Sequence, residues 1–209
     1  MFEDVQSSWL SKRQSSKLLL FLLCLMPFIY LVWAALTNNL GPDPAQALAD
    51  ASGEWTLRML LLTLALTPLR QITGSTVWVH YRRMAGLFAF FYALFHLLVY
   101  LFFLLGLQWQ TLWEDVLERP YIAAGSVSLL LMLPLAITST QSSRQRLGRR
   151  WKKLHRLVFA VAVSALVHLW WQVRSDATEA LLYTMLFALL MLPRLYMLLE
   201  RKLHSRKRR

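Results

Sequence analysis

The chain has 209 residues, of which 57% are hydrophobic, and its formal net charge is +12 at pH 7. The charged residues are confined to short segments between long apolar runs, whereas a soluble basic protein intersperses charged and apolar residues. The composition therefore excludes a soluble basic protein and favours a membrane protein, because about 20 apolar residues suffice for a helix to span the roughly 30 Å of hydrocarbon in a bilayer.

Six apolar runs predict transmembrane helices in chain order. The second run is short, so we expect its helix to take its first turn from residues 47–54. No soluble domain, convincing internal repeat or low-complexity tract separates the runs, and the first run is too long for the core of a signal peptide. The sequence predicts an all-α integral membrane protein, a six-helix transmembrane bundle that forms a single domain over residues 1–209. The expected helices cover residues 17–37, 55–69, 84–106, 121–138, 154–173 and 178–198.

All but three of the 23 lysines and arginines fall on one side of the membrane if the N-terminus is placed in the cytoplasm. The exceptions are Arg58, Arg119 and Arg174. Basic residues in short loops favour the cytoplasmic side, so we expect both termini to be cytoplasmic. The basic segment 201–209 follows directly after the last apolar run, which favours contact with anionic lipid over binding of nucleic acid.

Two histidines, His96 and His168, lie deep inside two different apolar runs. Counted from Arg83 and Lys153 at 1.5 Å per helical residue, both imidazoles lie about 20 Å from the cytoplasmic boundary. The two helices run in the same direction, so the two side chains are expected at the same depth. A histidine in hydrocarbon is costly without a partner, which makes both residues candidates for a functional site.

Small residues precede both histidines and leave room for a flat macrocycle: Ala89 and Ala93 before His96, and Ser164 and Ala165 before His168. Two imidazoles can serve as the axial ligands of a six-coordinate, electron-transferring haem. This pattern favours haem over histidines that hydrogen-bond neighbouring helices or relay protons. It also disfavours zinc, because no Cys, Asp or Glu lies at that depth to complete a tetrahedral site.

A third histidine, His155, lies at the cytoplasmic mouth of the fifth helix, where water and lipid headgroups make a histidine inexpensive. It precedes His168 by thirteen residues, which is about 3.6 helical turns, so the two side chains are expected to point in different directions. That angle is compatible with a surface residue and with a separate inner ligand. His80 and His204 lie in basic segments and are expected to be ordinary surface residues.

Several motifs around these histidines resemble one family. They are ArgArgMetAlaGlyLeu at 82–87, ThrSerThr at 138–140 and LeuGlyArgArgTrpLysLysLeuHis at 147–155, with further likeness at 41–45 and 119–122. The chain resembles the MsrQ (YedZ) family, the haem-binding membrane subunit of the bacterial periplasmic methionine sulfoxide reductase system. That family belongs to the ferric-reductase-like transmembrane domain superfamily, whose members include NADPH oxidases.

The resemblance implies a multi-pass protein of the bacterial inner membrane that carries haem b. It implies electrons from the quinol pool, or from a flavin on the inner side, and their delivery to a periplasmic molybdopterin methionine sulfoxide reductase that repairs oxidised proteins. The family's histidines fall on His96, His155 and His168. The chain itself is then a redox subunit without a methionine sulfoxide site, and both one and two haems are compatible with it.

One departure from the two-haem oxidases concerns the inner side. Those proteins pair two histidines on each of two helices, whereas Arg82 and Arg83 stand fourteen and thirteen residues before His96. His155 would then either bind a haem with a weak or non-protein second ligand or line another cofactor, and the resemblance also allows FMN. A flavin phosphate or haem propionates could pair with the surrounding cations, which the positive-inside rule accounts for equally well. These cations are Arg82, Arg83, Arg149, Arg150, Lys153 and Arg156.

Two outer features complete the sequence expectations. Arg58 follows Glu54 by four residues and is expected either to pair with it or to meet a haem propionate. The outer segments 38–54 and 107–119 are expected to dock the reductase through their acidic residues and tryptophans. The expected function is an electron conduit. The alternative is a proton or small-solute transporter that uses the buried histidines as relays.

Overall fold

The computed structural model describes the backbone of residues 2–207, with the side chains of residues 14–196 and of Glu200. All regular secondary structure in this part of the chain is helical, which confirms the predicted all-α class. The helices are α1 (Phe2–Leu36), α2 (Pro44–Thr73), α3 (Val77–Val99), the π-helical η1 (Tyr100–Leu104), α4 (Trp109–Glu118), α5 (Pro120–Ile137), α6 (Gln141–Leu147), α7 (Arg149–Leu154), α8 (Leu157–Gln172) and α9 (Thr178–Lys207).

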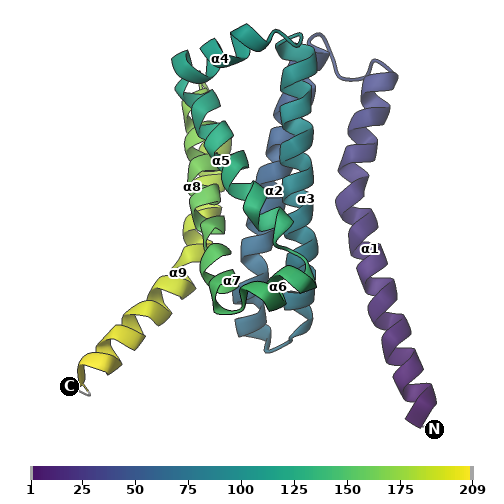
Figure 1. Ribbon diagram of the computed structural model, residues 1–209. Helices are drawn as coiled ribbons and strands as arrows, with labels where there is room; N and C mark the ends of the chain where they lie inside the picture. Colours follow the sequence, from purple (N-terminus) through teal and green to yellow (C-terminus); the bar gives the residue numbers. More distant parts are fainter. Residues whose placement is uncertain (1, 208–209) are drawn as a thin grey trace.

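Two helix pairs form the centre of the bundle (Figure 1). Helix α2 packs along α3, α5 packs along α8, and the pairs meet where α3 contacts α5 and α2 contacts α8. Helix α9 packs against α2 and α8, and α1 stands beside α2 and α3. Helix α4 crosses one end of the bundle, here named the α4 end. The opposite end, with α6, α7, the α2–α3 turn, the start of α1 and the end of α9, is named the basic end (Figure 1).

Five of the helices in the described part of the chain are long and apolar enough to cross a membrane. These five spans account for five of the six predicted helices: Gln14–Leu36, Val77–Leu104, Pro120–Ile137, Arg149–Gln172 and Thr178–Tyr196. The sixth predicted helix lies within α2, which has 30 residues. The first half of α2 carries Asp50, Glu54 and Arg58, and these charges lower its mean hydropathy below that of the other spans.

Helix α2 begins at Pro44 rather than near residue 55, because the segment before the apolar run has its own helix signals. The carboxylate of Asp43 accepts a hydrogen bond from the backbone N–H of Gln46 at 3.1 Å, and Pro44 occupies the first turn. Gly74 ends the helix with a positive φ of 68°. The expectation that this helix takes its first turn from residues 47–54 agrees with a start only three residues earlier, at Pro44. The short helices α4, α6 and α7 are polar in composition and were not predicted from the apolar runs.

Pro68 lies inside α2 and has no N–H to donate to the carbonyl of Leu64 one turn earlier. The guanidinium of Arg194 in α9 donates to that carbonyl at 2.6 Å, and it also donates to the carbonyl of Leu190 at 2.7 Å. A buried carbonyl without a partner is unfavourable, so Arg194 compensates for the proline and ties α9 to α2.

Helix α1 is attached to α3 through one tyrosine. Tyr92 is fully buried, and its hydroxyl donates to the carbonyl of Cys24 at 2.7 Å and accepts the N–H of Phe28 at 3.1 Å. The hydroxyl therefore stands between two backbone groups that would pair with each other in an undisturbed helix, next to Pro27. Between residues 14 and 36, where its side chains are described, α1 exposes many large apolar side chains, as expected for a helix that faces lipid.

The pairing of Arg194 with Leu64 can be tested by substitution. We expect Arg194→Leu to lower the free energy of unfolding by about 1–3 kcal/mol, because it leaves the Leu64 carbonyl without a partner. Adding Pro68→Ala restores an N–H to that carbonyl, so the double variant should recover most of the loss. Thermal unfolding in detergent, followed by circular dichroism, measures both. Equal melting curves for the parent and Arg194→Leu would contradict this account.

Candidate functional site

His96 of α3 and His168 of α8 meet between the two helix pairs. Their ring centroids are 6.1 Å apart, and the ring planes cross at 78°. Because an axial nitrogen lies about 2 Å from its metal and the ring centre about 1 Å behind that nitrogen, two imidazoles on one metal ion have centroids about 6 Å apart. The structure therefore brings the two predicted residues together at the separation that a shared metal ion requires.

Each imidazole is held by a backbone carbonyl of the other helix in its pair. Nδ1–H of His96 donates to the carbonyl of Ala49 in α2 at 2.9 Å, and Nδ1–H of His168 donates to the carbonyl of Tyr121 in α5 at 2.6 Å. The hydroxyl of Ser52 lies 3.2 Å from Nδ1 of His96 and donates to the same Ala49 carbonyl at 2.9 Å. With the proton on Nδ1, Nε2 carries the lone pair, which is the state that a metal ligand needs.

The donor set suits an iron porphyrin better than a metal ion held by protein groups alone. Within the described residues, no group of three or more His, Cys, Asp or Glu side chains could hold a metal ion. Two imidazoles leave the remaining positions of an octahedral ion to another ligand, and a macrocycle supplies four such nitrogens. The arrangement thus fits a haem with two axial histidines.

The two helix pairs repeat the same histidine motif. His96 and Ala49 are 47 residues apart, and so are His168 and Tyr121. Each ring also lies against a glycine one turn after the carbonyl it binds, Gly53 for His96 and Gly125 for His168. The prediction that the chain lacks an internal repeat is therefore wrong for this motif. The two copies share only one histidine, one glycine and their spacing, so sequence similarity alone does not reveal the repeat.

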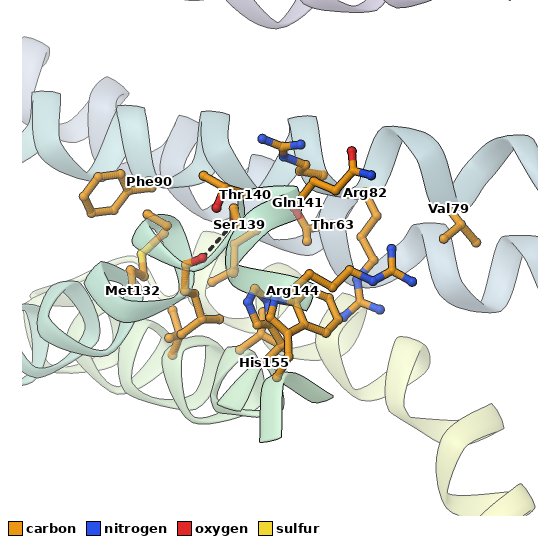
Figure 2. Close-up of a pocket in the computed structure, with 18 of the residues that line it drawn as sticks. Thr63, Val79, Arg82, Phe90, Met132, Ser139, Thr140, Gln141, Arg144 and His155 are labelled. Atoms are coloured by element: carbon orange, nitrogen blue, oxygen red, sulfur yellow. Dashed lines mark hydrogen bonds between the residues drawn. The ribbon is translucent and has the colours of Figure 1, made fainter. Parts of the chain in front are cut away.

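A cavity of about 790 Å³ opens at the basic end (Figure 2). Its inner part is apolar, with Leu60, Phe90, Met132, Val158 and Val161 among its lining residues. Its mouth is basic and polar, lined by Arg82, Arg83, Thr140, Arg144 and His155. Of the cations expected from the sequence to hold a cofactor, Arg82 and Arg83 line this cavity. Arg149 and Arg150 are not among its lining residues, and Arg144, which the sequence analysis did not single out, takes part instead.

His155 differs from the other two histidines in its hydrogen bonding. The Thr138 hydroxyl donates to the carbonyl of Pro134 at 2.6 Å, so it accepts Nε2–H of His155 at 3.1 Å. The ring stacks on Trp151 with centroids 4.0 Å apart, and the Trp151 indole N–H donates to the Thr138 carbonyl at 2.9 Å. In this state Nε2 of His155 is occupied. His155 lies in the mouth of the cavity rather than beside the His96–His168 pair.

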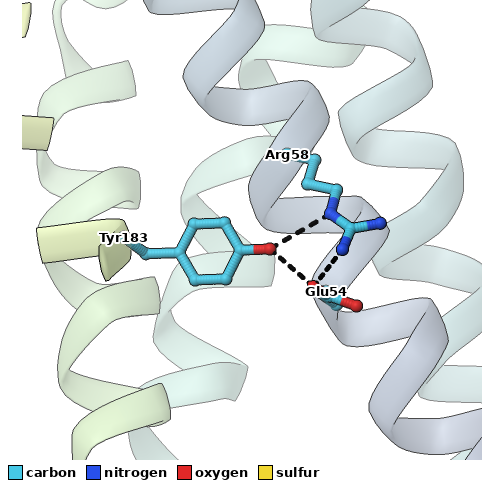
Figure 3. Close-up of polar contacts among 3 residues, drawn as sticks. All are labelled: Glu54, Arg58 and Tyr183. Atoms are coloured by element: carbon cyan, nitrogen blue, oxygen red, sulfur yellow. Dashed lines mark hydrogen bonds and ion pairs between the residues drawn. The ribbon is translucent and has the colours of Figure 1, made fainter. Parts of the chain in front are cut away.

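Arg58 takes part in a network with Glu54 and Tyr183 (Figure 3). The Tyr183 hydroxyl donates to Glu54 at 2.7 Å and accepts Nε–H of Arg58 at 3.1 Å, while Arg58 also forms an ion pair with Glu54. The guanidinium lies 4.7 Å from the ring centroid of Trp55. Of the two expectations for Arg58, the structure contains the ion pair with Glu54, and it adds a link from α2 to α9.

Asp115 of α4 is buried, unlike Glu114 and Glu118 on the same helix. Its carboxylate accepts the Tyr100 hydroxyl at 2.5 Å and forms an ion pair with Nε of Arg119 at 2.9 Å. Tyr100 follows His96 by one turn and begins η1, so this contact fastens α4 to the π-helical segment that continues α3. Asp115, one of the acidic residues of segment 107–119 that were expected to dock the reductase, is thus buried and paired within the protein.

The chain matches one family model and several curated proteins, and these matches agree with one another. The chain matches the model described as ferric reductase like transmembrane component over residues 52–166. It is also similar to proteins named protein-methionine-sulfoxide reductase heme-binding subunit MsrQ.

Three of these relatives show how much of the chain the similarity covers. The relative from Xanthomonas axonopodis pathovar citri is 47% identical over 160 residues, 77% of this chain and 73% of that protein. The relative from Xanthomonas oryzae pathovar oryzae is 46% identical over the same shares. The relative from Xanthomonas campestris pathovar campestris is 47% identical over 74% of this chain and 71% of that protein. No solved structure matches the chain.

Proposed function

The chain belongs to the MsrQ family of haem-binding subunits, within the ferric-reductase-like transmembrane proteins, and on that premise we propose that it is a membrane electron-transfer subunit whose haem is held by His96 and His168. The observation that carries this proposal is the matched pair of imidazoles, 6.1 Å apart, each with Nδ1–H bound to a backbone carbonyl. The bound haem, which we propose to be haem b, supplies one-electron redox chemistry. The two histidines supply its position and its axial nitrogens.

The proposed topology has six spans in a single domain over residues 1–209, with α2, whose first half carries three charged residues, as the span beyond the five most apolar ones. Helix α2 has 30 residues and runs the length of α3, which is itself long and apolar enough to cross a membrane. Both termini then belong to the cytoplasmic side of the bacterial inner membrane, because the basic residues cluster at that end. The α4 end faces the periplasm.

We assign electron input to the cavity at the basic end. Its apolar interior suits a ring system, and the guanidinium groups of Arg82, Arg83 and Arg144 suit a phosphate or carboxylate at the mouth. A quinol, FMN or a second haem would each place a ring system in the apolar interior, and FMN and haem would also bring an anionic group to the mouth. Arg149 and Arg150 lie between two lining residues, Gly148 and Trp151. Their positive charges therefore contribute to the electrostatic potential at the mouth of the cavity.

At the α4 end we propose that the partner is a periplasmic molybdopterin methionine sulfoxide reductase; the names of the relatives support a protein-methionine-sulfoxide reductase as the partner class. The exposed acids Glu114 and Glu118 and the exposed Trp109 and Trp113 are available for docking, whereas Asp115 is not. No methionine sulfoxide site is proposed in this chain itself.

The rival function is a proton or small-solute transporter with the buried histidines as relay groups. Transporter sites at mid-membrane are commonly built from broken helices. Here α3 is continuous through His96 and α8 is continuous through His168. In addition, both Nδ1 protons are engaged by helix carbonyls rather than by a chain of exchangeable groups. These contacts favour ligands over relays.

The ligand assignment predicts that His96→Ala and His168→Ala each abolish the low-spin bis-imidazole absorption spectrum of the purified protein, because each removes one of two axial nitrogens. His80→Ala serves as the matched control, since His80 is exposed at the basic end and should leave the spectrum unchanged. The assignment fails if either of the first two variants keeps the parent spectrum at full haem content.

A different outcome is expected for His155. Because it lines the cavity at the basic end, His155→Ala should leave the axial ligation of the His96–His168 haem intact. It should slow the reduction of that haem by a quinol or a reduced flavin in stopped-flow absorption measurements. His80→Ala is again the control. Reduction at the parent rate, with parent cofactor content, would remove His155 from the input side.

Docking through α4 predicts a salt-dependent effect of charge reversal. Glu114→Lys together with Glu118→Lys should slow electron delivery to the reductase, and the effect should fade as salt screens the charges. The haem spectrum should not change, because Asp115 and its contacts are kept. Glu200→Lys reverses an acid in the last helix, α9, and should have no effect. Equal transfer rates in the double variant and the parent at low ionic strength would exclude docking through these two acids.

A further inference from the structure

Gly53 and Gly125 provide the space in which the two imidazoles lie. A Cβ at position 53 would stand 3.2 Å from Cε1 and 3.3 Å from Nδ1 of His96. A Cβ at position 125 would stand 3.0 Å from Nδ1 and 3.1 Å from Cε1 of His168. Comfortable contacts between carbon atoms begin at about 3.5 Å. Any residue other than glycine would therefore press on the ring.

Both glycines lie inside helices, where glycine costs about 1 kcal/mol relative to alanine. Other glycines of the chain are in different situations. Gly86 also lies inside a helix, but the nearest atom to its Cβ position is Cγ2 of Thr63 at 3.5 Å, an ordinary contact. The need for a missing Cβ is therefore specific to the two glycines that touch a histidine.

Each ring is constrained in two ways. The hydrogen bond from Nδ1–H to a carbonyl one turn before the glycine fixes the direction of the ring, for Ala49 and Gly53 as for Tyr121 and Gly125. The helix surface at the glycine limits rotation of the ring about its Cβ–Cγ bond. The same two constraints act on both rings from opposite helix pairs. In this arrangement the two ring planes cross at 78°.

We propose that Gly53 and Gly125 are positioning residues that hold the planes of His96 and His168 nearly perpendicular at the iron. This inference rests on the proposed function, in which both histidines are axial ligands. The angle between two axial imidazole planes governs the splitting of the iron d orbitals. It therefore governs the anisotropy of the electron paramagnetic resonance signal of low-spin ferric haem, which is largest when the planes are crossed.

The test is the frozen-solution resonance spectrum of the ferric, haem-loaded protein. The parent should give a strongly anisotropic low-spin signal. Gly53→Ala and Gly125→Ala should lower the highest g value, and Gly125→Ala should do so more, because its Cβ would lie closer to the ring. Gly86→Ala is the matched control: Gly86 lines the cavity at the basic end and does not touch either histidine, so the signal of the His96–His168 haem should match that of the parent. Superimposable spectra for all four proteins at equal haem content would overturn the proposal.

A second variant keeps the test decisive if an added methyl group prevents folding. In His96→Gly, free imidazole can occupy the ring position, donate to the Ala49 carbonyl and lie against Gly53 without a covalent tether. The proposal expects added imidazole to restore the low-spin signal with the g values of the parent. A restored signal of lower anisotropy, or no binding of imidazole, would contradict it.

The outcomes also separate this inference from the proposed function. Loss of haem from Gly53→Ala or Gly125→Ala, with the helical content and elution volume of the parent and full haem in Gly86→Ala, supports displacement of the ligand by the methyl group. A parent without low-spin haem refutes the bis-histidine assignment itself. So does a His96→Gly variant that keeps the low-spin signal without imidazole.

Discussion

The structure depends on one interaction that occurs twice, the hydrogen bond from an imidazole Nδ1–H to the backbone carbonyl of a neighbouring helix inside the membrane bundle. An imidazole without a hydrogen-bond partner is unfavourable in hydrocarbon, so this bond offsets much of the free-energy cost of burying His96 and His168. It also fixes the tautomer and leaves Nε2 with its lone pair. Because donor and acceptor belong to different helices, the bond sets the register of α3 on α2 and of α8 on α5.

The proposed roles of the two ends of the bundle agree with the same arrangement. The histidine pair lies toward the α4 end, where Ala49 and Tyr121 are within the first turns of α2 and α5. Asp115 fastens α4 to Tyr100, one turn beyond His96. The cavity with Arg82 and His155 opens at the other end. A conduit across the membrane needs such polarity, with separate places for electron input and for delivery.

The sequence was most informative at polar or charged residues whose burial in a membrane is energetically unfavourable. Histidines in apolar runs and arginines between runs predicted the helices, the common depth of His96 and His168, and the location of His155 at the basic end. Polar helical segments carried no such signal, so residues 44–46 of α2 and the whole of α4 were not predicted. Helix α2 is capped by Asp43, and α4 is held by the hydrogen bond and ion pair of Asp115 with Tyr100 and Arg119. Neither kind of contact shows in hydropathy.

The positions that complete the site could not be predicted from residue type alone. A glycine inside a helix is silent in sequence, and only the equal spacing from Gly53 to His96 and from Gly125 to His168 could have marked the pair. Arg194 counts as one more basic residue at a helix end until the structure places it on the carbonyl that Pro68 leaves open. These roles arise from contacts between helices that are distant in the chain.

The central claim is that two neutral imidazoles, each still protonated at Nδ1, ligate one iron through Nε2. Near-infrared magnetic circular dichroism of the purified ferric protein tests it most directly, because the charge-transfer band of low-spin haem identifies the pair of axial ligands. The account predicts the band of two neutral histidines. A band typical of histidine with methionine, of histidine with an amine or of an imidazolate ligand, or a high-spin spectrum, would contradict it.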